Sequence, residues 1–237
     1  DIILNPNTNP IIDTQADISF IKLKSKNIVS NIYPLGALSK GSNSLELAEL
    51  RDMKESGAIG FYDYKKSIEN SNLLKTALLY TQTFDSLIFS FPMEKSISKN
   101  GVINEGLTST SYGIKGIPAI CEEIQINRDL KILEYTGGRL HIPTISCKSS
   151  VDLIRQAKNK GLNITCSVAI HNLIFNDEKL KDFDTRFKVL PPLRTELDRK
   201  ALIKGVEDGT IDLVTSDHSP IDIDHKKMDI ESADFGT

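Results

Sequence analysis

The most informative stretch of this chain is Ile211-Asp212-Leu213-Val214-Thr215-Ser216-Asp217-His218-Ser219-Pro220. It is an apolar run that ends in an aspartate and a histidine. In α/β barrels, acidic residues at the C-terminal ends of buried strands carry the chemistry. The stretch therefore predicts a buried strand over residues 211–216, with Asp217 as a candidate catalytic residue.

The composition is that of an ordinary α/β protein. The chain has 237 residues, of which 39% are hydrophobic and 26% are charged, which is enough to bury one sizeable core. We therefore expect one domain over residues 1–237. The formal net charge is -3, with Lys and Arg spread among acids, so nothing in the charge favours binding to nucleic acid or to an anionic membrane.

Cysteine usage and hydropathy bear on the cellular compartment. Cys121, Cys147 and Cys166 lack the paired spacing of a disulfide framework or a zinc knuckle. We expect reduced thiols in a cytoplasmic protein. No apolar run approaches the ~18 residues that a membrane helix needs, and the start lacks the pattern of a signal peptide. Because the chain opens on strand-like residues without an initiator Met, we expect it to be part of a longer one.

Short β-rich runs alternate with amphipathic segments, which is typical of parallel strands joined by helical crossovers. Strands are predicted near 1–4, 28–35, 58–63, 86–91, 139–146, 163–169 and 211–216, and helices over 13–25, 43–56, 69–83, 117–136, 148–160 and 196–208. Segment 92–116 reads as a long loop that could form part of a lid.

Seven such strands nearly complete a (β/α)8 TIM-type barrel. The alternative, an open doubly wound sheet, usually has a glycine-rich phosphate turn after its first strand. In this chain that turn is Asn5-Pro6-Asn7-Thr8-Asn9-Pro10. We therefore predict the barrel.

Several strings along the whole chain then occur in a recognisable order. They are Asn5-Pro6-Asn7-Thr8, Asn104-Glu105-Gly106, Tyr112-Gly113-Ile114-Lys115-Gly116-Ile117-Pro118-Ala119, Glu122-Glu123, Leu140-His141-Ile142-Pro143-Thr144-Ile145-Ser146, Thr165-Cys166-Ser167-Val168-Ala169-Ile170-His171-Asn172-Leu173, Pro191-Pro192-Leu193-Arg194 and Ser216-Asp217-His218-Ser219-Pro220. Together they resemble the dihydroorotases, metal-dependent cyclic amidohydrolases of pyrimidine synthesis built on a distorted (β/α)8 barrel. The resemblance implies an upstream strand with a His-x-His metal pair and an arginine for the substrate carboxylate. This sequence begins after that point, so the resemblance implies a barrel truncated by its first strand and its C-terminal part.

The resemblance implies zinc as the cofactor, with a zinc-bound hydroxide attacking the ring amide and an aspartate transferring the proton. Asp217 occupies the position of that aspartate. Its plainer interpretation is an acid that accepts hydrogen bonds from loop amides. The bridging carboxylate of the family falls on Glu94, one methylene longer than Asp, and the histidine of the same string falls on Phe91. Glu94 and Asp217 are thus weak metal-ligand candidates.

Two further histidine ligands of the family are replaced. The second histidine of its His-x-x-His string falls on Thr144, and the remaining His141 is interpreted as a packed strand residue. The next ligand falls on Asn172, beside His171. Adjacent strand residues point to opposite faces, so His171 would substitute for it only through a bulge.

The family's substrate contacts are also depleted. Asn7 is retained as a candidate substrate-binding residue, whereas the asparagine before the Pro-Pro-Leu-Arg string is Leu190 and a further histidine is Ile221. His218, after Asp217, is interpreted as a loop residue. His225 is interpreted as solvated.

The energetic consequence of losing zinc is large. Bulk water has a pKa of about 15.7 and zinc-bound water about 7, so making hydroxide without the metal costs roughly 12 kcal/mol more at neutral pH. Asp217 is too weak a base to make hydroxide from water in place of zinc, since the ordinary pKa of an aspartate is about 3.9. Metal-dependent ring opening by this chain is therefore doubtful, and a chain that holds no metal is an open alternative.

Three hypotheses follow. The first is a degenerate, non-catalytic dihydroorotase homologue. Zinc-less members of the family associate with aspartate carbamoyltransferase, which is the partner that the resemblance implies. The second is an active cyclic amidohydrolase with an atypical metal site, acting on dihydroorotate or another ring amide. The third is a barrel that binds a small ligand through Asn7 and loop amides without turnover. Because active members commonly dimerise, a homo-oligomer is expected.

Overall fold

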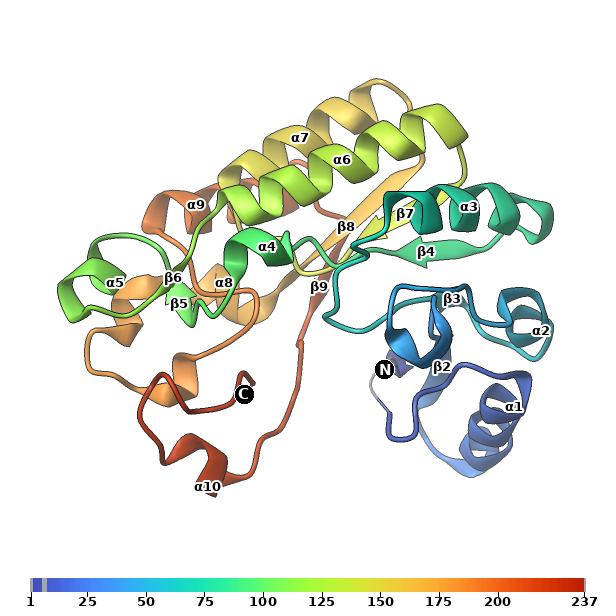
Figure 1. Ribbon diagram of the computed structural model, residues 1–237, viewed down its shortest axis with the longest axis horizontal. Coiled ribbons are helices and arrows are strands. Elements are labelled where there is room, and N and C mark those ends of the chain that lie inside the picture. The colour runs from blue at the N-terminus through green and yellow to red at the C-terminus, as the bar shows by residue number, and fades with distance from the viewer. Residues whose placement is uncertain (1, 6–7, 237) are drawn as a thin grey trace. The chain divides into compact units, whose positions relative to one another are not determined.

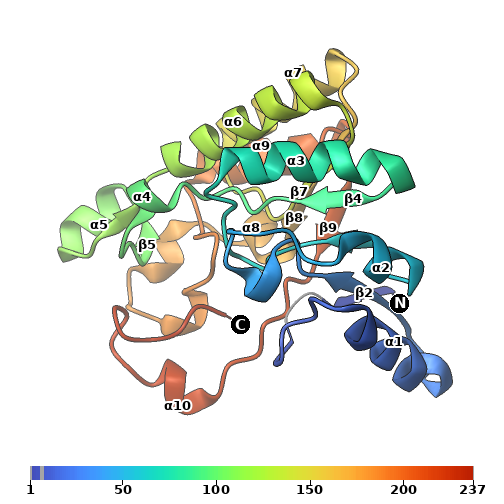
Figure 2. The same ribbon diagram turned by 45° about the vertical axis from the view of Figure 1, so that its right-hand side comes forward.

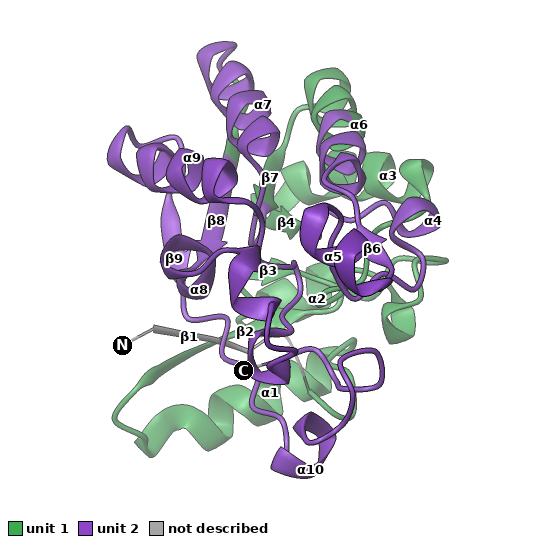
Figure 3. Ribbon diagram, turned by 90° about the vertical axis from the view of Figure 1, so that its left-hand side faces the viewer, with its two compact units in different colours: residues 1–91, 128–141, 162–164 green, residues 92–127, 142–161, 165–237 purple. Residues whose placement is uncertain are grey.

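The computed structural model describes residues 2–5 and 8–236, and the described chain divides into two compact units. Unit 1 comprises residues 1–91, 128–141 and 162–164, and unit 2 comprises residues 92–127, 142–161 and 165–237 (Figure 3). This division does not test the prediction of one domain, because a single barrel also contains more and less densely packed parts.

Unit 1 is built on parallel strands. They are paired in the order β1-β2-β3-β4-β7, and their bounds are β1 (Ile2–Asn5), β2 (Asn31–Gly36), β3 (Gly60–Phe61), β4 (Leu87–Phe89) and β7 (Arg139–Ile142, of which 139–141 lie in this unit). The register places Leu35 opposite Gly60 and Ile88 opposite Leu140. Every pairing in this series is parallel, as predicted from the alternation of strands and helices.

Gly60 shows why β3 is so closely packed. A Cβ atom at this position would lie 2.9 Å from both the carbonyl oxygen of Leu87 and the ring of Phe89. No side chain fits there, so the backbone of β3 can approach β4 only with glycine. Fully buried side chains of the same unit, among them Met53, Phe61 and Leu74, fill the space beside the strands.

The helices of unit 1 begin at residues that satisfy their first amides. α1 (Gln15–Lys24) starts at Thr14, which forms a capping box with Asp17, and α3 (Ser71–Thr81) starts at Asn70, whose side chain accepts from two amides. α2 (Leu50–Glu55) lies between them in the sequence and packs against α1. In the blue part of Figure 1, α1 and α2 lie beside β2 and β3.

Unit 2 contains the remaining elements. They are α4 (Lys95–Ser98), β5 (Ile103–Asn104), α5 (Leu107–Tyr112), β6 (Gly116–Ile117), the first part of α6 (Ile120–Thr136), α7 (Lys148–Asn159), β8 (Ile164–Ala169), α8 (Ile170–Ile174), α9 (Glu196–Glu207), β9 (Leu213–Thr215) and α10 (Ile223–Lys226). β5 pairs with β6 and β8 pairs with β9, both in parallel. α7 packs on α9, and both helices are labelled in Figures 1 and 2.

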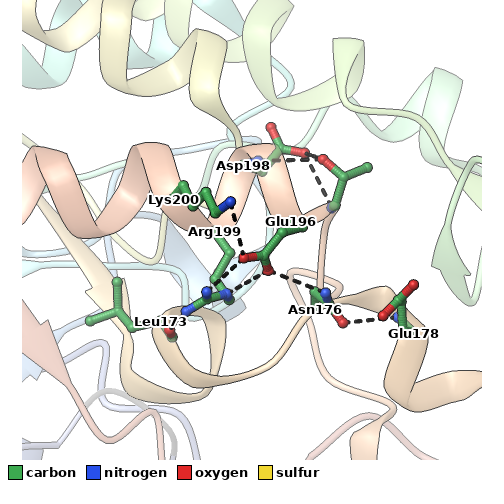
Figure 4. A network of polar contacts seen from close by, with 8 residues as sticks. Leu173, Asn176, Glu178, Glu196, Asp198, Arg199 and Lys200 are labelled. Carbon is green, nitrogen blue, oxygen red and sulfur yellow. Dashed lines mark hydrogen bonds and ion pairs between the residues drawn. The ribbon is translucent and has the colours of Figure 1, made fainter.

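A polar network joins α8 to α9 (Figure 4). Arg199 donates from Nε to Glu196 at 2.7 Å and from Nη1 to the carbonyl oxygen of Leu173 at 2.9 Å. The hydrogen bond from Arg199 is the main reason that the pKa of Glu196 is lowered to about 2. Asn176 donates to the same carboxylate at 3.2 Å. This network fixes the end of α8 against the start of α9.

Several sequence predictions need correction. Residues 43–49 are not helical, because an antiparallel bridge between Ser39 and Leu47 holds this segment, and the helix begins at Leu50. Segment 92–116 is not one long loop, since it contains α4, β5 and α5. These elements span only 2–6 residues each, too few for a periodic pattern to emerge.

The strand after α9 also differs from its prediction. β9 covers only residues 213–215, and its side chains are not buried: Leu213 is 55% and Val214 is 46% exposed. The reason is that β9 pairs with β8 on one side only within the part of the chain that the structure describes. Asp212, just before it, is held by the Cys166 amide at 2.8 Å and Lys158 Nζ at 2.7 Å.

No helix of the described residues is both long and apolar enough to cross a membrane.

Candidate functional site

In unit 1, aromatic rings occupy the ends of the strands. Tyr64 contacts Tyr62 edge-on at 5.8 Å between ring centroids, Tyr62 lies 5.6 Å from Phe89, and Phe89 lies 4.7 Å from the imidazole of His141. His141 is only 3% exposed. We call these four residues, which form a continuous series of contacts, the ring row. Offset and edge-to-face contacts of this kind stabilise packing.

Phe91 stands where the resemblance implied a metal-binding histidine. It lies two residues beyond β4 and is 1% exposed, so the position is filled by a buried hydrocarbon ring. The residue before it belongs to a structural network: Ser90 Oγ donates to Asp129 at 2.6 Å, and Arg128 pairs with the same carboxylate at 2.7 Å. The residues after β4 thus pack the interior of unit 1 and supply hydrogen bonds to its buried polar groups.

Thr144 follows β7 and adopts a left-handed backbone with φ of 49°. Its amide donates to Ser167 Oγ at 3.2 Å, and its side chain is buried. Among the described residues, no group hydrogen bonds with Thr144 Oγ1. Left-handed backbone is uncommon for a β-branched residue, and such strain is a frequent mark of functional sites.

Asn172 and His171 lie in α8, not in an extended strand. The bulge expected for His171 is therefore not needed, because helical neighbours are not placed on opposite faces. Both residues are buried. Asn172 Nδ2 donates to the carbonyl oxygen of Pro192 at 3.2 Å, which joins two of the strings that carry the family resemblance.

Asp217 lies two residues beyond β9, half-buried, with a left-handed φ of 48° and its amide donating to Thr215 Oγ1 at 3.2 Å. Glu94 is the N-cap of α4 and accepts from Ser96 through both the amide, at 3.2 Å, and the hydroxyl, at 2.8 Å. Glu94 thus has a structural task, which its position in the sequence did not reveal. The roles of Asp217 and Glu94 as metal ligands stay predictions.

The other predicted site residues are dispersed. His218 is exposed beside Asp217, and Ile221 is half-buried further along the same segment. His225 is exposed as predicted, but it lies in α10 and pairs with Asp234 at 2.7 Å. Asn7, the candidate for substrate binding, lies outside the described residues.

Unit 2 contains a buried network that the sequence reasoning missed. Glu122 is fully buried in α6 and accepts from the amides of Ser146 and Cys147, at 2.8 and 3.2 Å, and from the Ser146 hydroxyl. Ser146 Oγ in turn accepts from Nε of Arg194 at 3.1 Å. Arg194 also donates to Asn104 Oδ1 at 2.9 Å and is only 3% exposed. We call these residues the carboxylate network.

A charged residue inside an otherwise apolar string was the available signal for this network. Arg194 ends the string Pro191-Pro192-Leu193-Arg194, and Glu122 lies on the buried side of α6 next to Cys121. A charge in such a position must be paired or hydrogen bonded. The partners, however, come from distant parts of the sequence, so they could be found only in the folded chain.

The cysteines provide no nucleophile. All three are free and buried. Burial raises the pKa of Cys121 to about 11 and that of Cys166 to about 12, and it raises the pKa of Cys147 well above its ordinary value. Because the thiolate is the reactive form, these thiols are inert at neutral pH.

The chain is similar to known proteins of one family. A family model described as dihydro-orotase-like matches residues 2–150. The dihydroorotase of Acetivibrio thermocellus is 42% identical over 232 residues, and that of Pelotomaculum thermopropionicum is 42% identical over 231 residues. The chain belongs to the dihydroorotase-like family. Each alignment covers 98% of this chain and 54% of the relative, so the chain spans about half the length of these curated relatives.

Solved structures agree on the fold. The L-hydantoinase of Arthrobacter aurescens matches 99% of this chain and 55% of its own with a TM-score of 0.81 at 21% identity. The dihydroorotase of Saccharomyces cerevisiae, solved with 5-fluoroorotic acid, matches 99% of this chain and 66% of its own with a TM-score of 0.76 at 14% identity. The prediction of a partial (β/α)8 barrel of the amidohydrolase type is confirmed.

The dihydroorotase-like family consists of metal-dependent amidohydrolases that generally use zinc. Zinc is bound in proteins by Cys, His and acidic side chains. At the three positions where the resemblance implies histidine ligands, this chain has Phe91, which offers no donor, and Thr144 and Asn172, which offer weak neutral oxygens. Within residues 2–5 and 8–236, no three His, Cys, Asp or Glu side chains lie together so as to hold a metal ion. The residues present do not fit zinc.

Proposed function

We propose that this chain belongs to a non-catalytic dihydroorotase-like protein of pyrimidine synthesis that supports the assembly of aspartate carbamoyltransferase. The observation that carries the proposal is Phe91, a fully buried phenylalanine at the position of a metal-binding histidine. A hydrocarbon ring cannot donate to zinc, and its packing fills the space that a ligand would need.

Two other positions support the same conclusion. Thr144 and Asn172 replace histidines, and the side-chain oxygens of both have no hydrogen-bond partner among the described groups. Without a zinc-bound hydroxide the chain lacks a nucleophile for the ring amide, at a cost of roughly 12 kcal/mol relative to zinc-bound water at neutral pH. The barrel, by contrast, is retained with its packing and its buried networks. A retained fold with a depleted site is what a structural partner requires.

Co-purification tests the partnership. The full-length protein, tagged and isolated from its own host under gentle conditions, should bring down aspartate carbamoyltransferase in a stoichiometric complex. Removal of the protein should lower the carbamoyltransferase activity of the extract by disrupting that assembly. Isolation of the protein alone, with carbamoyltransferase assembled normally in its absence, would contradict the partnership.

An active cyclic amidohydrolase with an atypical site is the second candidate function. The observation that favours it is Asp217, which is retained in the position of the proton-transfer residue and is half-buried just beyond β9. An active enzyme should hydrolyse dihydroorotate or a related ring amide, and Asp217→Ala should lower the rate by about 100-fold or more.

The matched control for that assay is Asp224→Ala, which removes an exposed carboxylate from the same C-terminal segment. It should leave the rate unchanged in an active enzyme. Absence of ring opening by the wild-type protein, with zinc supplied, would exclude this second function and leave the first.

A further inference from the structure

Unit 1 contains a small pocket that none of the predicted metal or catalytic residues lines. Its volume is about 90 Å³, and it is formed by residues of segment 8–12 and by segments around the C-terminal ends of β2 and β3. Liquid water occupies about 30 Å³ per molecule, so the pocket accepts a group of a few non-hydrogen atoms. Its other lining residues include Tyr62 and Tyr64 of the ring row.

The floor of the pocket is aliphatic. Ile12, Leu35 and Ala37 line it and are 5%, 2% and 3% exposed, so these side chains belong to its buried part. A polar group alone would lose its hydration against this surface without compensation. The floor therefore favours an apolar tail.

The polar groups of the pocket favour an anion. Lys66 lines it from an exposed position, with Nζ donating to the carbonyl oxygen of Ser42 at 3.1 Å. An ammonium has three N–H groups, and this bond uses one. Thr8 Oγ1 is buried and has no hydrogen-bond partner among the groups that the structure describes. A buried hydroxyl without a partner is an uncommon feature that a ligand oxygen would satisfy.

The charges of the lining residues narrow the class of ligand. Among the described residues that line the pocket, Lys66 is the one cation and none is an acid. A singly charged anion is thereby favoured over a cation or a zwitterion. Inorganic phosphate would match the sign of the charge but not the aliphatic floor.

We propose that this pocket binds a short-chain aliphatic monocarboxylate, with the carboxylate at Lys66 and Thr8 and the tail on Ile12, Leu35 and Ala37. This function is independent of ring-amide chemistry and of any carbamoyltransferase. Thr8 belongs to one of the strings that carry the family resemblance, whereas Lys66 does not, and the assignment rests on the lining residues alone.

Propionate is the probe for the test. Methyl NMR spectra of the full-length protein, titrated with propionate, should show saturable shifts at the methyl groups of Ile12, Leu35 and Ala37. Lys66→Gln should weaken propionate binding by about threefold to fivefold, the effect of losing an ion pair at an exposed side chain, whereas Lys66→Arg should retain it. Propionamide, which has the same tail but no charge, should bind more weakly by about threefold or more.

Lys26→Gln is the matched control, because it removes the same charge from an exposed position of unit 1 that does not line the pocket. Thr8→Val, which replaces the hydroxyl with a methyl group of similar size, should also weaken binding. Absence of saturable shifts in the wild-type protein would overturn the proposal. Equal affinities of Lys66→Gln and wild type, or of propionate and propionamide, would overturn it as well.

Discussion

The ring row of unit 1 and the carboxylate network of unit 2 show two different ways of filling a protein interior. In the ring row, Tyr64, Tyr62, Phe89 and His141 contact one another through their faces and edges. In the carboxylate network, Glu122 and Arg194 are joined through Ser146 by hydrogen bonds. The first region gains stability from burial of apolar surface, and the second from the pairing of groups that would otherwise be costly to bury.

The difference shows that the two regions of this chain are stabilised by different kinds of contact. The ring row includes no acid and no metal-binding pair, and the neighbouring Phe91 extends its apolar character. The carboxylate network retains buried charge, yet its carboxylate is surrounded by donors of the protein itself. Neither region presents a group poised to activate water. Both are expected to matter for stability.

The largest effect is expected in the carboxylate network. Glu122→Ala should lower the free energy of unfolding by about 3–5 kcal/mol, because it leaves the amides of Ser146 and Cys147 and the Ser146 hydroxyl buried without their acceptor. It also removes the negative charge that Ser146 links to the buried guanidinium of Arg194. Urea unfolding monitored by circular dichroism measures this loss. Glu123→Ala is the matched control, since Glu123 is the next residue and accepts from Ser149 Oγ at 2.6 Å; it should cost about 1 kcal/mol. Equal losses of unfolding free energy in the two variants would show that the carboxylate network does not contribute the expected stability.

A smaller effect is expected in the ring row. Phe89→Ala removes a central ring and should cost about 3 kcal/mol through lost burial and the cavity left behind. The control is Phe84→Ala, because Phe84 is half-buried and contacts only Tyr80 among the aromatic pairs described, at 5.2 Å. It should cost less, in proportion to the smaller area removed from water. If thermal unfolding shows Phe84→Ala to be the more damaging change, the ring row is not a stabilising element.

The smallest effect concerns Asp63, which lies next to Tyr62 and is 1% exposed. Burial raises its pKa above the ordinary 3.8, although the Ser39 hydroxyl and the amides of Leu38 and Ser39 bond to it. A raised pKa means that the folded chain holds the proton more tightly, so this contribution to stability is full below the ordinary pKa and is lost as pH rises through the raised value.

Comparison with Asp63→Asn isolates that contribution. The free energy of unfolding of the wild type, minus that of the variant, should fall as the pH rises from about 4 to about 7. Urea midpoints across that range measure it. A difference that grows with pH would mean that the hydrogen bonds to the carboxylate outweigh its burial, which contradicts a raised pKa for Asp63.

Most of the fold could be predicted from the sequence. All seven predicted strands are present in the described chain, since apolar runs bounded by turns are strong signals, and helices such as α7 and α9 nearly coincide with their predicted ranges. The start of α2 could not be predicted from local periodicity. The residues before it are held by the carboxylate of Asp63, which accepts from the Leu38 amide, and by the bridge between Ser39 and Leu47. The exposure of β9 depended on its neighbours in the sheet, which no local pattern reveals.

The candidate site was predictable only in part. Comparison of sequence strings with those of the dihydroorotases finds Phe91, Thr144 and Asn172 where the resemblance implies histidines. The burial and hydrogen bonds of these three side chains appear only in the folded chain. Glu94 caps a helix, which its string did not reveal, and α8 formed where an extended strand had been assumed. Arg194 and Glu122 belong to the same strings, but their link through Ser146 joins residues far apart in the sequence. Long-range hydrogen bonds of this kind arise from the fold, not from local propensity.

The central claim is that the ligand positions of this barrel no longer fit zinc. The most direct test is the zinc content of the full-length protein, purified without chelator and then offered zinc, beside a variant carrying Phe91→His, Thr144→His and Asn172→His. We predict a folded wild-type protein with sub-stoichiometric zinc and a higher zinc content in the variant. One or more zinc ions held tightly by each wild-type chain would contradict the claim.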